Sequence, residues 1–427
     1  MQISLPPHPS RSSNPGAPGR EVVYSTGYPL TLHWLALAAA LGLLLLAAVQ
    51  HIVPLLAMTS FLLVLAAASW FWSRQSLKRI SCQLTLGQER AFFGEQIDLA
   101  FAATNAKRLF LPWLEIEAEL PRRLASGSLK ADSPYSKERL RWTTSISGGQ
   151  QVRWKHRLEC KARGDYQLGP VRLRSGDVFG LFPREMIPHL FEPLLVYPRI
   201  VPVDKLELPL SELTGETGIP RSIYEDATQT MGTREYQHND PFKRIHWKAS
   251  ARRSQIQARQ YESTTSLSLF LILDTGSFCG DNADEEAFEL AVTAAASLSY
   301  EACRQESPFG LMANSYPEIQ LPVSSGRSQL FLILEALARV QPASKAPLGE
   351  LMDRCRGNLP VGTTLVIISH GLSDTLARLL HRLRQDGYSM LLVSAGRPVP
   401  DTGLADIPAV SVLSLADLSR DPAEAAR

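Results

Sequence analysis

The sequence predicts three folded parts: a two-helix transmembrane hairpin, then a β-sandwich domain, then an α/β Rossmann-like domain. Three observations predict them: two adjacent uncharged apolar segments, a region of alternating apolar and polar residues, and a region where strand-like runs alternate with helical spacing. The expected parts are a flexible cytosolic tail, the hairpin, the β-sandwich, a junction and the α/β domain, at residues 1–29, 30–72, 80–205, 206–262 and 263–420.

The hairpin is predicted from two apolar segments that lie almost end to end. Residues 30–49 and 52–72 contain no Asp, Glu, Lys or Arg. Each is close to the roughly 20 residues that a helix needs to cross about 30 Å of hydrocarbon. A signal peptide would have one shorter apolar core, whereas here a second span follows at once. The sequence therefore predicts that residues 30–72 contact the lipid bilayer.

The flanking charges predict the orientation of the hairpin. Arg11 and Arg20 precede the first span, and Arg74, Lys78 and Arg79 follow the second. Positive residues favour the cytosolic side of a membrane. Five scattered cysteines without a CxxC pair favour free thiols in a reducing compartment. We therefore expect a multi-pass protein of the cell inner (cytoplasmic) membrane, with both termini and the soluble domains in the cytosol.

The β-sandwich is predicted from alternation with period two. QIDLAFAATN (96–105), WLEIEAEL (113–120) and QQVRWKHRLECKARG (150–164) alternate apolar and polar residues, as strands with one buried face do. Short clusters of Ser, Gly, Arg and Asp separate the runs and indicate turns. Several short strands with such breaks are typical of a sandwich.

The α/β domain is predicted from apolar strands that alternate with helices. The expected strands are residues 266–274, 308–314, 363–369 and 388–396, and the expected helices are 284–303, 328–340 and 373–387. Strands that alternate with helices favour a largely parallel sheet covered on both faces. Ligands of such sheets bind at the carboxyl ends of the strands.

The junction contains a dense basic and aromatic stretch, GTREYQHNDPFKRIHWKASARR (232–253). Asp240 followed by Pro241 predicts the start of a helix that runs to about Arg253. Phe242, Ile245 and Ala249 would share one face of this helix, and Trp247 lies off that stripe. If the Trp247 indole is buried, its replacement by Ala should destabilise the protein by about 3–5 kcal/mol.

Three functions could use this stretch. His246 and Ser250 lie one helical turn apart and, with Asp240 to orient the His, could form a hydrolase site, but no nucleophile-elbow motif is present. The basic helix with Trp247 could contact nucleic acid, but a formal net charge of +2 argues against a polyanion partner, and we expect none. The third reading is a network in which Arg234, Arg244 and nearby acids lock neighbouring elements together, on a surface that also receives a partner protein.

Three ordered stretches carry a family resemblance: RGDYQLGPVRLRSGDVFGLF (163–182), LLVYPRI (194–200) and residues 232–253. The chain resembles the bacterial family known as domain of unknown function fifty-eight. The residues that match the motif of that family are Arg234, Tyr236, Asp240, Arg244, Ile245, Trp247, Lys248, Ser250, Ala251 and Arg252. The resemblance implies a membrane hairpin, a β domain and a von Willebrand factor A-like domain. It also implies an accessory or assembly factor whose gene often lies beside that of a MoxR-type AAA+ ATPase.

A von Willebrand factor A domain usually binds a divalent metal through Asp-x-Ser-x-Ser and an Asp after the central strand. Here Asp274 is present, Gly276 and Phe278 replace the two serines with Ser277 between them, and His370 falls where the second Asp would be. Magnesium prefers six oxygen ligands, so we expect no metal and no cofactor.

Together these observations predict a membrane-anchored accessory or assembly protein, not an enzyme, whose cytosolic α/β domain docks a partner protein such as a MoxR-type AAA+ ATPase. One alternative is a hydrolase that uses His246 and Ser250. A second is a metal-dependent protein-binding domain with a degenerate site at Asp274, Ser277 and His370.

Overall fold

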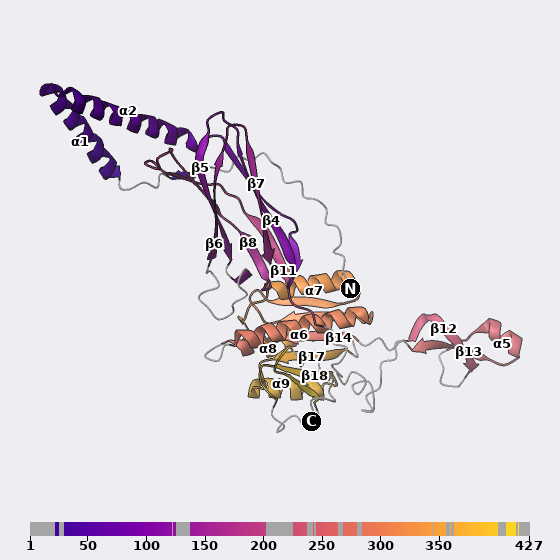
Figure 1. The fold of residues 1–427 in the computed structure, drawn as a ribbon. Coiled ribbons are helices and arrows are strands. Elements are labelled where there is room, and N and C mark those ends of the chain that lie inside the picture. The colour runs from indigo at the N-terminus through magenta and orange to yellow at the C-terminus, as the bar shows by residue number, and fades with distance from the viewer. Residues whose placement is uncertain are drawn as a thin grey trace. The chain divides into compact units, whose positions relative to one another are not determined.

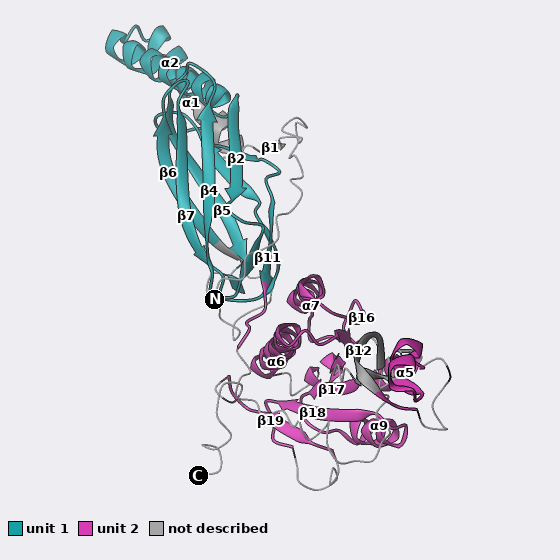
Figure 2. Ribbon diagram, turned by 90° about the vertical axis from the view of Figure 1, so that its right-hand side faces the viewer, with its two compact units in different colours: residues 1–196 teal, residues 197–427 magenta. Residues whose placement is uncertain are grey.

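A computed structural model describes residues 22–24, 30–121, 123–124, 137–201, 225–236, 242, 245–263, 268–279, 284–344, 346–355, 359, 363–399, 407–415 and 417. The chain divides into two compact units, Met1–Val196 and Tyr197–Arg427, which are coloured separately in Figure 2. Each unit is described by itself below.

Two helices open the first unit: α1 at Leu30–Val49 and α2 at Val53–Ser76. Among the described residues, α2 is the one helix that is long and apolar enough to cross a membrane, judged by length and composition. The part of α1 whose side chains are described, Ala38–Val49, is apolar but shorter. One candidate span is therefore found where two were predicted, and the two-span topology with both ends in the cytosol stays a prediction.

Helix α2 runs past the predicted end of its apolar segment and leads directly into the β structure. It ends at Ser76, and the next residue, Leu77, is buried in the hydrophobic core of the unit. Strand β2 begins at Ile80.

The rest of the first unit is built from strands in three sheets, within which the longer strands pair antiparallel. One sheet has the order β1-β10-β9-β5-β6 and contains Val22–Tyr24, Arg184–Ile187, Val171–Ser175, Leu111–Pro121 and Lys137–Ile146. A second has the order β2-β4-β7 and contains Ile80–Leu86, Gln96–Asn105 and Gln151–Glu159. The third has the order β3-β11-β8 and contains Arg90–Phe92, Glu192–Tyr197 and Gly164–Leu168.

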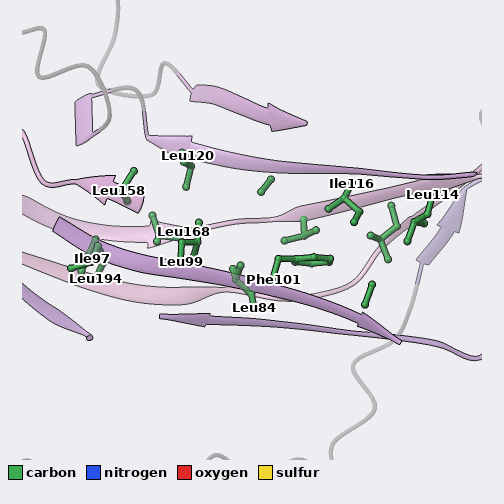
Figure 3. Close-up of a cluster of buried hydrophobic side chains, with 14 of the residues drawn as sticks. Leu84, Ile97, Leu99, Phe101, Leu114, Ile116, Leu120, Leu158, Leu168 and Leu194 are labelled. Atoms are coloured by element: carbon green, nitrogen blue, oxygen red, sulfur yellow. The ribbon is translucent and has the colours of Figure 1, made fainter. Parts of the chain in front are cut away.

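These sheets share one hydrophobic core. Along β4 the side chains of Ile97, Leu99 and Phe101 are buried while Gln96 and Asp98 are exposed, as the predicted alternation requires. Figure 3 shows how the buried side chains of β4 meet those of other strands, including Leu114, Ile116, Leu120 and Leu168.

A six-stranded sheet dominates the second unit. Its order is β16-β15-β14-β17-β18-β19, at Ile319–Ser324, Phe309–Ala313, Leu269–Leu273, Thr364–Ser369, Ser389–Ala395 and Ala409–Val412. All neighbours are parallel except β16, which is antiparallel to β15. Counted along the chain the order is 3-2-1-4-5-6, so the direction of progression reverses between β14 and β17.

Helices cover both faces of this sheet (Figure 1). Helices α8 (Leu348–Cys355) and α9 (Asp374–Gln385) pack against the face that carries Phe270 and Ile272. Helix α6 (Glu285–Arg304) packs against strands β14, β15, β17 and β18, and α7 (Arg327–Arg339) against β15 and β16. The predicted helices 284–303 and 373–387 are therefore present, and each predicted strand of the region is present within a few residues of its expected bounds.

Candidate functional site

The first candidate site lies at the carboxyl ends of the central strands in the second unit. Strands β14 and β17 are parallel, with Leu273 beside Ile368, so the segments that follow them start at the same edge. Strand β15 flanks β14 on the other side, with Ala313 beside Leu273. The reversal of strand order between β14 and β17 is where open α/β sheets bind ligands. Polar side chains that follow the three strands are Asp274, Asn314 and His370.

Buried Asn314 links the segments that follow β14 and β15. Its Oδ1 accepts the backbone N–H of Thr275 at 2.7 Å, and its Nδ2 donates to Oδ1 of Asp274 at 2.8 Å. The Thr275 hydroxyl lies 3.0 Å from both Asn314 Oδ1 and the carbonyl oxygen of Ala343, and it donates to one of them. The amide of Asn314 therefore holds the Asp274 carboxylate and the start of the next turn in one arrangement.

The environment of Asp274 changes its acidity. Burial raises the pKa of this carboxyl above its usual value, because a charged carboxylate loses hydration inside the protein. The hydrogen bonds that it accepts from Asn314 and from the backbone of Gly276 and Ser277 lower the pKa and offset part of that effect. Oxygen atoms of Asp274 are thus already engaged with donors of the protein.

Ser277 connects the segments that follow β14 and β17. Its hydroxyl donates to the carbonyl oxygen of Asp274 at 2.7 Å and accepts the backbone N–H of His370 at 3.0 Å. The short 3-10 helix η2, Thr275–Phe278, places the Ser277 side chain between the two strands. Ser277 therefore acts as a structural bridge.

The imidazole of His370 is buried against aromatic and backbone groups. Its Nδ1 lies 2.9 Å from the carbonyl oxygen of Ala395. A carbonyl can only accept, so Nδ1 carries a proton. The ring centroid of Phe278 is 5.2 Å from that of His370 and 5.3 Å from that of Phe288. Phe278 thus occupies, with an apolar ring, the position at which a ligating serine was expected by the family resemblance.

These contacts test whether the site fits a divalent metal. Magnesium requires several free oxygen ligands in octahedral geometry. Here Asp274 accepts from three protein donors, the Ser277 hydroxyl makes two hydrogen bonds, and Phe278 offers no oxygen. No group of three or more His, Cys, Asp or Glu side chains with metal-binding spacing occurs among the residues that the structure describes. The donor set does not fit magnesium.

The second candidate site is a hairpin with one short helix, which we call the motif module. Strands β12 (Glu225–Glu235) and β13 (Gln257–Ser263) are antiparallel, with Arg234 beside Ala258. Between them lies helix α5, Trp247–Arg253. Ile245 is buried and forms an isolated β-bridge with Ala258.

The predicted helix of this stretch is shorter than expected. It begins at Trp247 rather than near Pro241, because the preceding backbone pairs with β13 instead: Ile245 bridges Ala258, and the N–H of His246 donates to the carbonyl oxygen of Gln257 at 2.8 Å. Tertiary pairing overrides the local start signal.

His246 and Ser250 are both committed to the backbone. His246 caps α5, with Nδ1 accepting the N–H of Ala249 at 3.1 Å. The Ser250 hydroxyl donates to the carbonyl oxygen of His246 at 3.1 Å and accepts the N–H of Gln257 at 2.9 Å. A nucleophile and its base must share a hydrogen bond. This arrangement provides a helix cap and a strand tie in place of a serine–histidine pair.

Large apolar side chains of the motif module face solvent. Trp247 is 72% exposed and Phe242 is 82% exposed. The prediction that Phe242, Ile245 and Ala249 share one face of a helix is therefore wrong for Phe242 and Ile245, because α5 begins only at Trp247. The Trp247 indole is not buried either, so the condition for a large loss of stability on its removal is not met.

The remaining motif residues lie around this exposed surface. Lys248 and Arg252 are exposed, and Nη1 of Arg234 donates to the carbonyl oxygen of Glu235 at 3.1 Å. The ring of Tyr236 lies 6.2 Å from that of Phe242. Two predicted members of the network, Asp240 and Arg244, lie outside the described residues.

Sequence reasoning missed Asn314, Thr275 and Gln257. The rule that ligands and polar contacts gather after parallel strands could have found Asn314, because it directly follows an apolar strand as Asp274 does. No such signal marks Gln257, because it contacts Ser250 and His246 through its backbone N–H and carbonyl oxygen rather than through its side chain.

Comparison with known proteins gives a family match and few functional details. Residues 232–422 match the family model described as "Protein of unknown function DUF58". Over 179 residues the chain is 30% identical to "Uncharacterized protein YeaD" of Bacillus subtilis (strain 168), a match that covers 41% of this chain and 42% of that protein. The chain thus aligns with less than half the length of this curated relative.

Solved structures show weak similarity. Proximal thread matrix protein 1 from the mussel byssus is 15% identical over 36% of this chain and 44% of that one, with a TM-score of 0.29. The CARDB domain of a Pyrococcus furiosus protein is 6% identical over 27% of this chain and 91% of that one, with a TM-score of 0.19.

Proposed function

We propose that the chain is a membrane-anchored accessory or assembly protein, without catalytic activity of its own, whose second unit docks a partner protein. The anchor is helix α2, and the soluble units face the cytosol, where the basic residues after α2 favour them. The partner is a MoxR-type AAA+ ATPase, as the family resemblance implies. The second unit is a von Willebrand factor A-like domain, a proposal supported by the strand order 3-2-1-4-5-6.

One observation carries the docking proposal: the exposed indole of Trp247 on a firmly held helix. Tryptophan is enriched among residues that dominate binding energy at protein interfaces, as is arginine. Trp247 is 72% exposed, and the bonds of Ser250 to His246 and Gln257 fix the helix that carries it. The indole can therefore be buried by a partner with little loss of conformational freedom.

The charges beside the indole indicate the chemistry of the partner surface. Lys248 and Arg252 are exposed on the same helix, and Arg253 is exposed at its end. Helix α5 contains no acidic residue. A surface with an apolar pocket rimmed by carboxylates would complement the motif module.

The test is capture of a MoxR-type AAA+ ATPase of the same cells by the full-length chain in membranes. A hot-spot side chain contributes at least about 2 kcal/mol, so Trp247→Ala should weaken binding by about 30-fold or more. Leu332→Ala, which removes an exposed apolar side chain on α7, is the matched control and should bind normally. Capture that is unchanged in Trp247→Ala would refute docking through the motif module, and capture of no ATPase by the parent chain would refute the choice of partner.

A further inference from the structure

The connection between β9 and β10 carries an unusual set of exposed side chains. Its residues 177–182 read DVFGLF, and Val178, Phe179 and Leu181 are exposed, with Phe179 60% exposed. Single exposed apolar residues are ordinary on protein surfaces, but three within four residues form a patch that marks a contact site. We call residues 178–181 the apolar loop.

The carboxylate of Asp177 organises the apolar loop from inside. Asp177 is buried, and its Oδ2 accepts the backbone N–H of Phe179 and of Leu181 at 3.1 and 3.2 Å. Its Oδ1 accepts the N–H of Phe182 at 2.7 Å, and its carbonyl oxygen accepts the N–H of Gly180 at 3.2 Å. The backbone N–H groups of four consecutive residues, 179–182, thus have acceptors, which lowers the cost of moving this irregular segment into a medium of low polarity.

The apolar loop adjoins the end of the candidate membrane helix. The hydroxyl of Ser73, near the end of α2, donates to the carbonyl oxygen of Phe182. Ser73 directly follows Trp72, the last residue of the uncharged apolar segment. A second contact holds the same end, because Nζ of Lys107 donates to the carbonyl oxygen of Gln75 at 2.6 Å. If α2 crosses a bilayer, these contacts hold the apolar loop at the level of the lipid headgroups.

Two arginines provide positive charge at this level. The guanidinium of Arg74 lies 4.8 Å from the ring centroid of Trp70, and Arg74 is exposed. Burial, and then the charge of Arg74, lowers the pKa of Arg184. Arg74 directly follows Ser73, and Arg184 lies two residues after Phe182, whose carbonyl oxygen accepts from Ser73. The two arginines therefore lie near the same contact, and an anion beside both would relieve their mutual repulsion. Anionic phospholipid headgroups supply such a charge at the cytosolic surface.

We propose that the apolar loop is a second membrane contact of the first unit. Val178, Phe179 and Leu181 insert into the interfacial layer of the bilayer beside α2, and Arg74 and Arg184 bind the phosphate of an anionic phospholipid. The proposal rests on the anchoring by α2 proposed above and goes beyond it, because it assigns a lipid contact to the β structure.

The test measures the depth of residue 179 in the full chain. A nitroxide is attached to Phe179→Cys, and the chain is reconstituted in vesicles of phosphatidylcholine with phosphatidylglycerol. The control is Phe191→Cys, which replaces a 41% exposed side chain. The Phe191 side chain lies beside Gly169, which precedes β9, whereas the apolar loop follows the carboxyl end of β9. The control position is therefore at the opposite end of that strand. The unsubstituted chain gives the background from native thiols.

We expect the ratio of collisions with oxygen, which dissolves in lipid, to collisions with a water-soluble nickel chelate to be severalfold higher at residue 179 than at 191. In vesicles of phosphatidylcholine alone, or in an Arg184→Gln background, the ratio at 179 should fall. Equal ratios at 179 and 191 in a chain that stays with the vesicles after alkaline carbonate washing would overturn the proposal. Shielding of residue 179 only in native membranes would also overturn it, in favour of a protein occupant. Release of the chain by carbonate would instead refute the anchoring by α2.

Discussion

Removal of the Asn314 side chain should be among the most damaging single changes in the second unit. Asn314→Ala leaves the buried N–H of Thr275 without its acceptor and takes one donor from the Asp274 carboxylate, whereas the Thr275 hydroxyl keeps Ala343 as a partner. The buried N–H left without a partner costs about 1–3 kcal/mol, and the hydrogen bond lost by the Asp274 carboxylate, which keeps two other donors, about 1.5–3 kcal/mol, so we expect a loss of about 2.5–6 kcal/mol. For a unit of this size, a loss of about 4 kcal/mol lowers the melting temperature by about 8–16 °C.

The assay is thermal unfolding of the second unit within the full chain, with deuterium exchange at the Thr275 amide to localise the change. Asn314→Asp is a control of the same shape that replaces the donor facing Asp274 with an acceptor. The carboxyls of residues 274 and 314 would then share one proton, so the folded state should retain a proton that the unfolded chain releases above about pH 4. The stability of Asn314→Asp should therefore fall as the pH rises from about 5 to 7 relative to Asn314→Ala. A melting temperature of Asn314→Ala within about 2 °C of the parent would show that the network contributes nothing of this size.

Three further outcomes follow from the same structure. Burial raises the pKa of Asp274, so the folded state holds a proton that the unfolded chain loses, and the stability of the parent should fall as the pH rises above about 4. Asp274→Asn lacks this titration, so its melting temperature minus that of the parent should increase with pH. A difference that decreases with pH would contradict this. Ser250→Ala should speed deuterium exchange at the Gln257 amide and lower stability by about 1–2 kcal/mol; unchanged exchange would show that the tie is not formed in solution. Gly396 has φ +79°, and a Cβ added there would lie 2.5 Å from a side chain of helix α6, so Gly396→Ala should destabilise the protein by at least about 2 kcal/mol. Gly349, on α8, has open space around it, so Gly349→Ala should stabilise the protein by about 0.5–1 kcal/mol. Equal melting temperatures of the two variants would refute the steric argument.

The elements predicted best from the sequence are those whose pattern is local. The alternation in residues 96–105 matches strand β4 at both ends, and the capped run 284–303 matches α6 to within one residue. Asp284 caps that helix through the N–H groups of Glu286 and Ala287, which is a signal written in consecutive residues. Burial of one face and a local cap are enough to fix such elements.

The motif module shows where local reading fails. Asp240–Pro241 resembles a helix start, yet the helix begins only at Trp247, because Ile245 pairs with Ala258, thirteen residues later. Exposure of Trp247 is likewise a property of the assembled module, since no spacing rule distinguishes an exposed indole from a buried one. The sequence could therefore indicate which stretch is unusual but not which of its side chains face solvent.

The candidate site after the parallel strands was found in part. Asp274, Ser277 and His370 were located through the resemblance to a metal-binding motif, and the Ser277 hydroxyl joins the other two. What they do there depends on Asn314 and on the ring of Phe278, which come into place only when β15 and α6 pack against β14. Loss of the expected serines is thus compensated by packing that the sequence alone does not specify.

The continuity of α2 with the core of the first unit has a mechanical consequence. Leu77 is anchored among core side chains immediately after the helix ends, so the helix cannot swivel freely on a flexible hinge. If α2 lies in a bilayer, a torque or pull exerted on it by changes in bilayer thickness would reach the strands through Leu77 and through the contacts of Ser73 and Lys107. Tension in the lipid would then produce strain within the β structure, so α2 would transmit force to the strands as well as hold the chain in the bilayer.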